Sequence, residues 1–152
     1  ALAAQVNQSS YALNQKVNPS PMGSAHPNIC PYGDIVECEG GDYLLFAVGT
    51  DAQYLRLAEV LNEPRMLADN FQTNPQRVIH RTTLINILQD TCQQYTASSL
   101  HEKLTAANIP CAQVRGILDA FEKQPQMTHE TAIDNTSFLV GKTTCFHLES
   151  NT

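Results

Sequence analysis

A proline-rich segment near the start of the chain limits what this sequence can fold into. Residues 16–33 contain four prolines and two glycines, so no regular helix can run through them. We therefore predict a long loop or extended segment. Long ordered loops in compact domains are often functional, although a simple connector between two elements explains the same composition.

Regular structure is expected on both sides of this segment. Before it, apolar residues at helical spacing predict a helix over 1–15. After it, residues 34–38 and 43–49 have the character of strands, and a Gly-Gly turn lies between them. We therefore predict a β-hairpin over 34–49.

Capping signals predict three helices in the middle of the chain. Thr50 or Asp51 is expected to cap the first, which Pro64 stops. Asn74 is expected to cap the second, with Pro75 at its first helical position, and the apolar stripe of this helix extends for about twenty residues.

The third helix has a cap at Thr96 or Ser98, and Glu102 lies at capping-box distance from Ser99. It should end at Asn108, a residue that tolerates the left-handed C-cap conformation.

The remaining elements are short. We predict strands over 111–114, 130–133 and 142–148, and a short helix over 117–123. The order of strand pair, helices and strand pair indicates an α+β fold, with a small antiparallel sheet flanked by helices. The leading helix and the proline-rich loop precede this unit.

Composition and charge exclude several classes of protein. Hydrophobic residues make up 42% and charged residues 16%, which excludes a disordered tail. No apolar run approaches the ~20 residues that span a bilayer, so we expect no membrane partner. The net charge is -6 and the nine Lys and Arg residues are spread thinly, so we expect no nucleic-acid partner.

The five cysteines argue against a disulfide framework. Their number is odd and no C-x-x-C pair occurs, which also argues against a zinc knuckle. We expect buried thiols in a reducing compartment, and hence a cytoplasmic protein. The first residues lack the basic and apolar regions of a signal peptide, so we expect the chain to begin within a longer protein.

Several segments together resemble one family, the class III CoA-transferases of the CaiB/BaiF group. Gly23–Tyr32 (GSAHPNICPY) resembles their GNAHPNIxPY loop, and Phe46–Tyr54 (FAVGTDAQY) resembles their AVGNDxQF turn. Further segments are similar to their FATNxxRVxNR, AGVPCGPV and VFADPQ motifs, and they are Phe71–Asn74 with Arg77 and Arg81, Ala107–Val114, and Phe121 with Pro125 and Gln126. Order and spacing agree throughout, whereas Ser24, Asn108 and Ala112 depart from the motifs.

The resemblance implies an architecture and a chemistry. In this family a small domain is inserted into a Rossmann-like large domain, and two protomers interlock as rings. An Asp of the large domain attacks the acyl-CoA thioester, and forms a mixed anhydride and then an aspartyl-CoA thioester. That Asp precedes the region present here, so we expect no catalytic nucleophile in this chain.

The same resemblance assigns roles to the parts of the chain. Residues 1–33 would be the helix and active-site-facing loop that lead from the large domain, and 34–152 would be the small α+β domain. No tightly bound cofactor is expected, and coenzyme A would be a substrate. The partners would be an acyl-CoA, a carboxylic acid and a second copy of the protein in a homodimer.

The loop is the candidate substrate-binding site. The residues concerned are Gly23, Ser24, Ala25, His26, Pro27 and Asn28. Gly and small side chains let backbone N–H groups approach a polarised oxygen closely. His26 could donate to such an oxygen or act as a general acid or base. Its ring could equally fix the loop by bonding to backbone.

The turn that contains Asp51 and Gln53 helps to distinguish a CoA-transferase from a racemase. They follow a buried strand, where functional residues often gather, but we expect Asp51 to be a helix cap. Racemases of the same superfamily typically carry the motif AVGAIEPQF at this position. The Glu of that motif is part of their acid–base machinery. The Thr50–Gln53 sequence therefore favours a transferase.

Other polar groups are given ordinary roles. Glu37, Glu39 and Asp42 are expected to form a solvated turn rather than a metal site. Arg77 and Arg81 lie one helical turn apart and are expected on a solvated face. The remaining histidines show no ligand spacing, and Cys145 beside His147 gives weak evidence for a dyad or a metal; these histidines are His80, His101, His129 and His147.

We expect the longer protein to transfer CoA between an acyl-CoA and a carboxylic acid, and this chain to be inactive by itself. Two alternatives remain open. The protein could be an α-methylacyl-CoA racemase-like isomerase, or the chain could be a stand-alone binding or assembly module.

Overall fold

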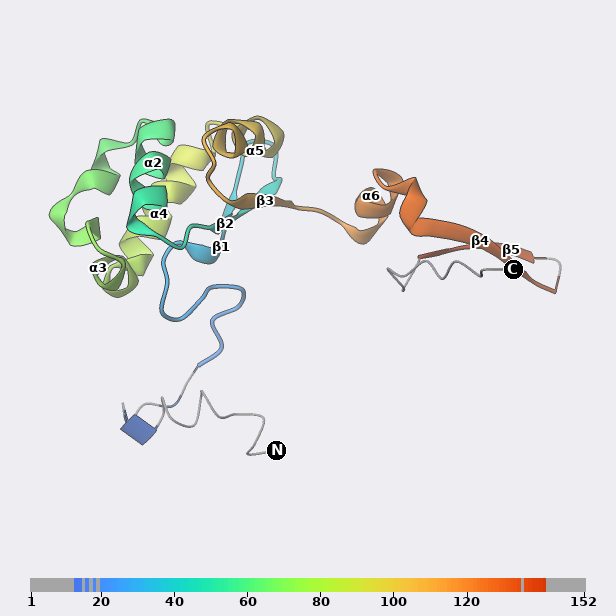
Figure 1. Cartoon of the computed structure of the whole chain (residues 1–152), viewed down its shortest axis with the longest axis horizontal. Helices are drawn as coiled ribbons and strands as arrows, with labels where there is room; N and C mark the ends of the chain where they lie inside the picture. The colour runs from blue at the N-terminus through green and yellow to red at the C-terminus, as the bar shows by residue number, and fades with distance from the viewer. Residues whose placement is uncertain (1–12, 15, 17, 19, 135, 142–152) are drawn as a thin grey trace, which may run out of the picture. The chain divides into compact units, whose positions relative to one another are not determined.

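The computed structural model describes residues 13, 14, 16, 18, 20–134 and 136–141. The chain forms two compact units that divide after Gln113 (Figure 1). The helix predicted over 1–15 lies almost wholly outside the described residues. The α+β prediction is confirmed, but the strands form two separate small sheets rather than one.

A three-stranded sheet forms the centre of the first unit. Strand β1 (Tyr32–Glu37) pairs antiparallel with β2 (Tyr43–Ala47), and β3 (Cys111–Val114) completes the order β1-β2-β3. The hairpin predicted over 34–49 is confirmed, although β1 begins earlier, at Tyr32. Gly40 and Gly41 both adopt positive φ in the turn, which is why a glycine pair is needed there.

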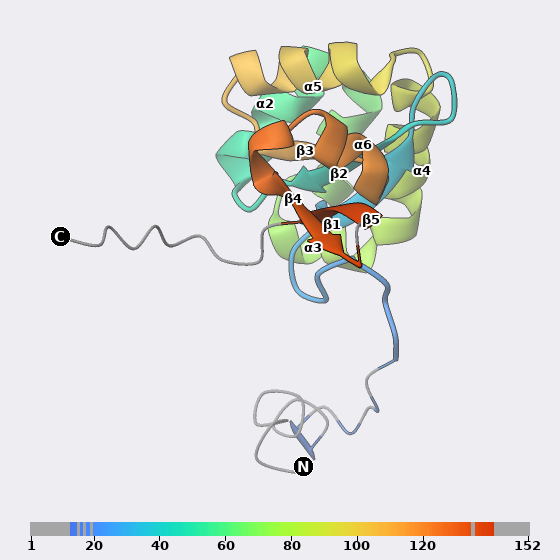
Figure 2. The same cartoon turned by 90° about the vertical axis from the view of Figure 1, so that its right-hand side faces the viewer.

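Four helices follow the hairpin in the first unit, and two of them pack against its strands. They are α2 (Asp51–Leu61), α3 (Asn74–Ile79), α4 (Arg81–Cys92) and α5 (Ala97–Ala106), with 3-10 turns η2 (Pro64–Leu67) and η3 (Asp69–Phe71) between α2 and α3. Helix α4 packs against β1 and α5 packs against β2. Figure 2 shows α5 running beside α2, which it also contacts.

The first helix is capped by Thr50 and not by Asp51. The Thr50 hydroxyl accepts from Gln53 N–H at 3.2 Å, and Gln53 Oε1 accepts from Thr50 N–H at 3.2 Å. This reciprocal pair is a capping box, so the expectation that Asp51 is the cap is wrong. Asn62 ends the helix in the left-handed conformation before Pro64 is reached.

The helix predicted to start at Asn74 and Pro75 and to continue for about twenty residues is in fact two helices. His80 has φ −99° and ψ 23°, which separates α3 from α4. The N-cap of α3 is Thr73, so the prediction that Asn74 is the cap is wrong. The N–H and the hydroxyl of Thr73 both donate to Gln76 Oε1. Asn74 is the first helical residue, and its side chain is left available for other contacts.

Helix α5 is capped by Thr96, one of the two predicted caps. The Thr96 hydroxyl accepts from Ser99 N–H at 3.3 Å, so Ser99 lies inside the helix. The capping box proposed between Ser99 and Glu102 is therefore wrong. Asn108 has φ 56°, which confirms its predicted left-handed conformation after the helix.

The core of the first unit is apolar and includes three of the cysteines. Cys30, Cys38 and Cys92 are buried free thiols beside large residues such as Phe46 and Leu88. Burial raises the pKa of Cys30 and of Cys92 to about 12. The prediction that these cysteines behave as small hydrophobes is confirmed for these three.

The second unit is small. It contains α6 (Ile117–Glu122), the 3-10 turn η4 (Pro125–Met127), β4 (Thr128–Ile133) and β5 (Thr136–Gly141). Strands β4 and β5 pair antiparallel in continuous register. Strand β5 was not predicted, because its apolar run lacks clear alternation with polar residues. The strand predicted over 142–148 lies outside the described residues.

Within the described part of the chain, no helix is long and apolar enough to cross a membrane.

Candidate functional site

The loop Gly23–Tyr32 is folded back on itself. The N–H of His26 donates to the Tyr32 carbonyl at 2.7 Å, and the Ser24 hydroxyl donates to the Gly33 carbonyl at 2.6 Å. Gly33 has φ +75°, and a β-carbon there would collide with the Ser24 carbonyl. Glycine is therefore required where the two arms of the loop meet.

Arg81, the first residue of α4, fixes the middle of the loop. Its Nη2 donates to the carbonyls of His26 at 2.5 Å and Ile29 at 2.7 Å. Its Nη1 lies 2.6 Å from both carboxylate oxygens of Asp34 in β1. The Asp34 side chain is 6% exposed, so this is a largely buried ion pair. The expectation that Arg81 lies on a solvated face is wrong.

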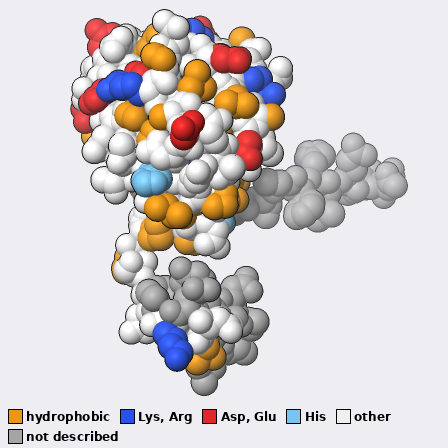
Figure 3. All heavy atoms as spheres, turned by 90° about the vertical axis from the view of Figure 1, so that its left-hand side faces the viewer, with side chains coloured by type: hydrophobic (Ala, Val, Ile, Leu, Met, Phe, Trp, Pro, Cys, Tyr) orange, Lys and Arg blue, Asp and Glu red, His pale blue; other side chains and the backbone are white. Residues whose placement is uncertain are grey.

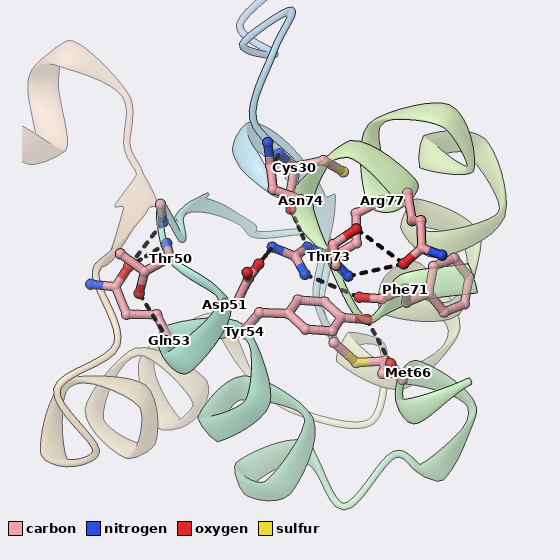
Figure 4. A network of polar contacts seen from close by, with 12 residues as sticks. Cys30, Thr50, Asp51, Gln53, Tyr54, Met66, Phe71, Thr73, Asn74 and Arg77 are labelled. Carbon is pink, nitrogen blue, oxygen red and sulfur yellow. Dashed lines mark hydrogen bonds and ion pairs between the residues drawn. The ribbon is translucent and has the colours of Figure 1, made fainter. Parts of the chain in front are cut away.

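Two residues of α3 hold the rest of the loop. Asn74 Nδ2 donates to the Asn28 carbonyl at 2.8 Å, and Asn74 Oδ1 accepts from Cys30 N–H at 3.1 Å. Arg77 Nε donates to the Cys30 carbonyl at 2.9 Å. Figure 4 shows Asn74 and Arg77 reaching from this helix toward Cys30. The peptide between Cys30 and Pro31 is cis.

Arg77 also connects the loop to α2. Its Nη2 lies 2.6 Å from Asp51 Oδ1, and its Nη1 donates to the Phe71 carbonyl at 3.0 Å. The guanidinium lies 4.2 Å from the centre of the Tyr54 ring, whose hydroxyl donates to the Met66 carbonyl at 2.8 Å (Figure 4). Arg77 is buried, so the predicted solvated face is wrong here too.

The predicted site residues are consecutive in the chain and all lie on this loop. Gly23, Ser24, Pro27 and Asn28 are exposed, whereas Ala25 and His26 are half-buried. The carbonyls of residues 26, 28, 29 and 30 all accept from side chains of α3 and α4. What the loop leaves accessible is therefore mainly side chains, and not backbone acceptors.

His26 is the one titratable side chain of the loop apart from the buried Cys30 and the phenol of Tyr32. Its Nδ1 accepts from Asn28 N–H at 3.1 Å. Its ring packs edge-on against Tyr32, with ring centres 5.7 Å apart. The interpretation that the ring fixes the loop through backbone thus holds at Nδ1, and leaves Nε2 for another role.

The other polar candidates do not assemble into a site. Among the residues that the structure describes, no group of His, Cys, Asp and Glu could hold a metal ion. The backbone of Glu37 is paired with the Gln89 side chain through both its N–H and its carbonyl. Cys145 and His147 lie outside the described residues. On the face drawn in Figure 3, Lys and Arg side chains lie in separate groups among acidic ones.

Sequence reasoning missed the residues that hold the loop in place. Asn74, Arg77 and Arg81 were visible as parts of a motif, and their spacing would put them near one face of a continuous helix. Nothing in that spacing reveals that their partners are loop carbonyls. Asp34, which completes the Arg81 contact, gave no signal at all.

Comparison with known proteins identifies relatives of this arrangement. A family model described as CoA-transferase family III matches residues 1–144. A succinate–glutarate CoA-transferase of Agrobacterium fabrum (strain C58 / ATCC 33970) is 29% identical over 122 residues, which cover 75% of this chain and 30% of that protein.

Solved structures are similar as well. A CAIB/BAIF family protein from Brucella suis has a TM-score of 0.69 and 28% identity, with 84% of this chain and 34% of that chain covered. The protein Rv3272 from M. tuberculosis has a TM-score of 0.71 at 16% identity, a likeness of fold alone, with 97% and 38% covered. This chain thus spans about a third of the length of these relatives.

Proposed function

Because this chain belongs to CoA-transferase family III, we propose that it forms one wall of an active site that moves coenzyme A from an acyl-CoA to a carboxylic acid. The Asp nucleophile that the resemblance implies is placed outside this chain. Residues 1–33 would lead in from a large domain, and 34–152 would be the small domain. By itself the chain would not catalyse transfer.

The observation that carries this proposal is the way the loop is held. Side chains from α3 and α4 bind four of its carbonyls, so its conformation is set before any substrate arrives. Acyl transfer depends on groups that already face the place where charge develops on oxygen. A loop of small residues with an accessible imidazole meets that requirement, whereas a mere connector would not need so many side-chain bonds.

The position of Asp51 supports a transferase over a racemase. In the racemase-like pattern a Glu in this turn serves acid–base chemistry. Here the nearest carboxylate, Asp51, is paired with the buried guanidinium of Arg77 at 2.6 Å. A carboxylate bound in that way serves the fold, because it is the counter-ion of a buried guanidinium.

Further parts of the proposal rest on the resemblance and the sequence. We propose a homodimer as the working form, because interlocked protomers are typical of the family. A cytoplasmic location follows from an odd number of cysteines without disulfide spacing.

The experiment compares the 152-residue chain with the longer protein that carries it. Each is incubated either with succinyl-CoA and free glutarate or with glutaryl-CoA and free succinate, the two acids named for the Agrobacterium relative. The CoA thioesters are then separated by chromatography. We expect transfer by the longer protein and none by the chain. Hydroxylamine should convert the aspartyl-CoA thioester into a hydroxamate on an Asp outside this chain, with release of CoA.

Two other results would redirect the assignment. Exchange of configuration at the α-carbon of a 2-methylacyl-CoA, without transfer, would identify a racemase. Neither activity, with stable binding of a partner protein, would favour an assembly module. Turnover by the 152-residue chain alone would show that the nucleophile lies within it.

A further inference from the structure

The hydrogen bond at His26 Nδ1 determines which ring nitrogen carries the proton. Asn28 N–H donates to Nδ1 at 3.1 Å, so Nδ1 must present a lone pair. In a neutral imidazole the proton is then on Nε2. No described residue forms a hydrogen bond with Nε2, so this N–H remains available to a ligand.

The same bond restricts what His26 can do in catalysis. To accept a proton at Nε2, the neutral ring would have to carry its proton on Nδ1, where the Asn28 N–H already points. To act as an acid, the ring would have to be protonated at both nitrogens, which breaks the same bond. Donation of a hydrogen bond from Nε2, without transfer of the proton, requires no such change.

The backbone around His26 is prevented from rearranging by Arg81. One guanidinium nitrogen, Nη2, bonds the carbonyls of His26 and Ile29, which lie on either side of the Pro27–Asn28 turn. The turn that carries the Asn28 N–H is thus held at both ends. Asp34 in turn holds the other side of the guanidinium through Nη1. Such forked contacts suit Arg and cannot be reproduced by Lys.

We propose that His26 is neutral and donates a hydrogen bond from Nε2–H to the acyl carbonyl oxygen of the CoA thioester. In this proposal Arg81 is the residue that positions His26. This inference rests on the proposed CoA transfer. When a carboxylate attacks the thioester carbon, negative charge develops on that oxygen and a fixed donor stabilises it. The attack forms a C–O bond to the acyl carbon and breaks the thioester C–S bond, so that CoA leaves as a thiolate. The His26 proton stays on Nε2 throughout.

The first test examines the tautomer in the 152-residue chain itself, labelled with 15N. A through-hydrogen-bond coupling is expected between the Asn28 amide nitrogen and Nδ1 of His26, together with a protonated Nε2. Arg81→Lys should weaken or abolish the coupling while the amide spectrum of the core is kept. A proton found on Nδ1, or no coupling in the wild-type chain, would overturn the proposal without touching the assigned activity.

The second test uses three substitutions in the longer protein. Gln places an amide N–H near the position of Nε2, whereas Asn places one near Nδ1. We expect His26→Gln to keep kcat within about tenfold, and His26→Asn and His26→Ala to lose about 10²–10³-fold with little change in KM. If His26→Gln were as slow as His26→Ala, a proton-transfer role would replace the donor role. Unchanged values of kcat in all three variants would exclude any role of His26 in catalysis.

The positioning role of Arg81 is tested with a double-mutant cycle in the longer protein. Arg81→Lys should lower kcat, and the double variant with His26→Ala should be no slower than His26→Ala alone, because both act through one hydrogen bond. Additive losses would show that Arg81 acts otherwise, for example on the fold. A wild-type protein that transfers no CoA would overturn the proposed function and this role together.

Discussion

The guanidinium of Arg77 lies 2.6 Å from the Asp51 carboxylate and joins the start of α2 to the loop through the Cys30 carbonyl. The Arg77 side chain is 1% exposed, whereas that of Asp51 is 55% exposed. Among the described residues, one partly solvated carboxylate pairs with this charge in the core. Such a cation stabilises the fold only while its hydrogen bonds are complete.

Arg77→Met should destabilise the protein. The substitution leaves the carbonyls of Cys30 and Phe71 without their donors, and we expect a loss on the order of 3 kcal/mol in the free energy of unfolding. Urea unfolding followed by circular dichroism measures it. Arg56→Met, at an exposed position of α2, is the matched control and should change stability by less than about 0.5 kcal/mol. Equal stability of the two variants would contradict the role given to Arg77.

Gly33→Ala should cost more than Gly40→Ala, although both glycines have positive φ. At Gly40 an added β-carbon meets nothing within 4 Å, so only the backbone conformation is penalised, by about 1 kcal/mol. At Gly33 the β-carbon collides with the Ser24 carbonyl, and the loop must move. Thermal unfolding of both variants tests the difference. A Gly33 variant no less stable than the Gly40 variant would mean that the two arms of the loop are not in contact.

Glu63 should make stability depend on pH in the acid range. Hydrogen bonds from Arg65, and one from the Thr91 hydroxyl, lower the pKa of the Glu63 carboxyl to about 2. Because the folded pKa lies below the ordinary value of 4.5, this stabilisation is present above about pH 4.5 and is lost as the pH falls toward 2.

Glu63→Gln should therefore be less stable than the wild type at pH 7, and the difference should shrink between pH 5 and 2. Denaturant unfolding at several pH values measures this. Glu59→Gln, at an exposed position of α2, is the control. A difference that stays constant across this range would indicate that the Glu63 charge contributes nothing.

The buried thiols should resist alkylation in the folded protein. With the pKa of Cys30 and of Cys92 at about 12, the thiolate fraction at pH 8 is on the order of 10⁻⁴. Cys111 is only half-buried and should react with iodoacetamide earlier than either. Peptide mapping after timed labelling checks the order, and all should react alike in denaturant. Rapid labelling of native Cys30 would mean that the loop opens readily.

Local signals predicted most of the fold. The Gly40–Gly41 turn predicted the hairpin, Thr50 and Thr96 were among the expected caps, and Asn108 adopts its predicted left-handed conformation. Each of these depends on neighbours within a few residues of the chain. Strand β5 was missed because periodicity is the signal that its apolar run lacks.

The candidate site divides in the same way. Its residues could be chosen from the sequence, since proline and glycine excluded regular structure and the resemblance identified the loop. The sequence did not predict which side chains hold the loop, or which ring nitrogen of His26 is free. The bonds that hold the loop join residues 44 to 55 positions apart, from Asn74 with Cys30 to Arg81 with His26. The bond from Asn28 to His26 Nδ1 spans only two positions, but it belongs to a turn that Arg81 holds at both ends.

The sequence by itself thus determined where the chain turns, most of the segments that are helical or extended, and which family it resembles. Only the tertiary structure decided that Arg77 and Arg81 serve the interior, that the long helix breaks at His80, and that Asp51 is bound in an ion pair. The physical reason is that turns and caps are satisfied by adjacent residues. A buried guanidinium instead takes its partners from whichever segments the packing of the core brings to it.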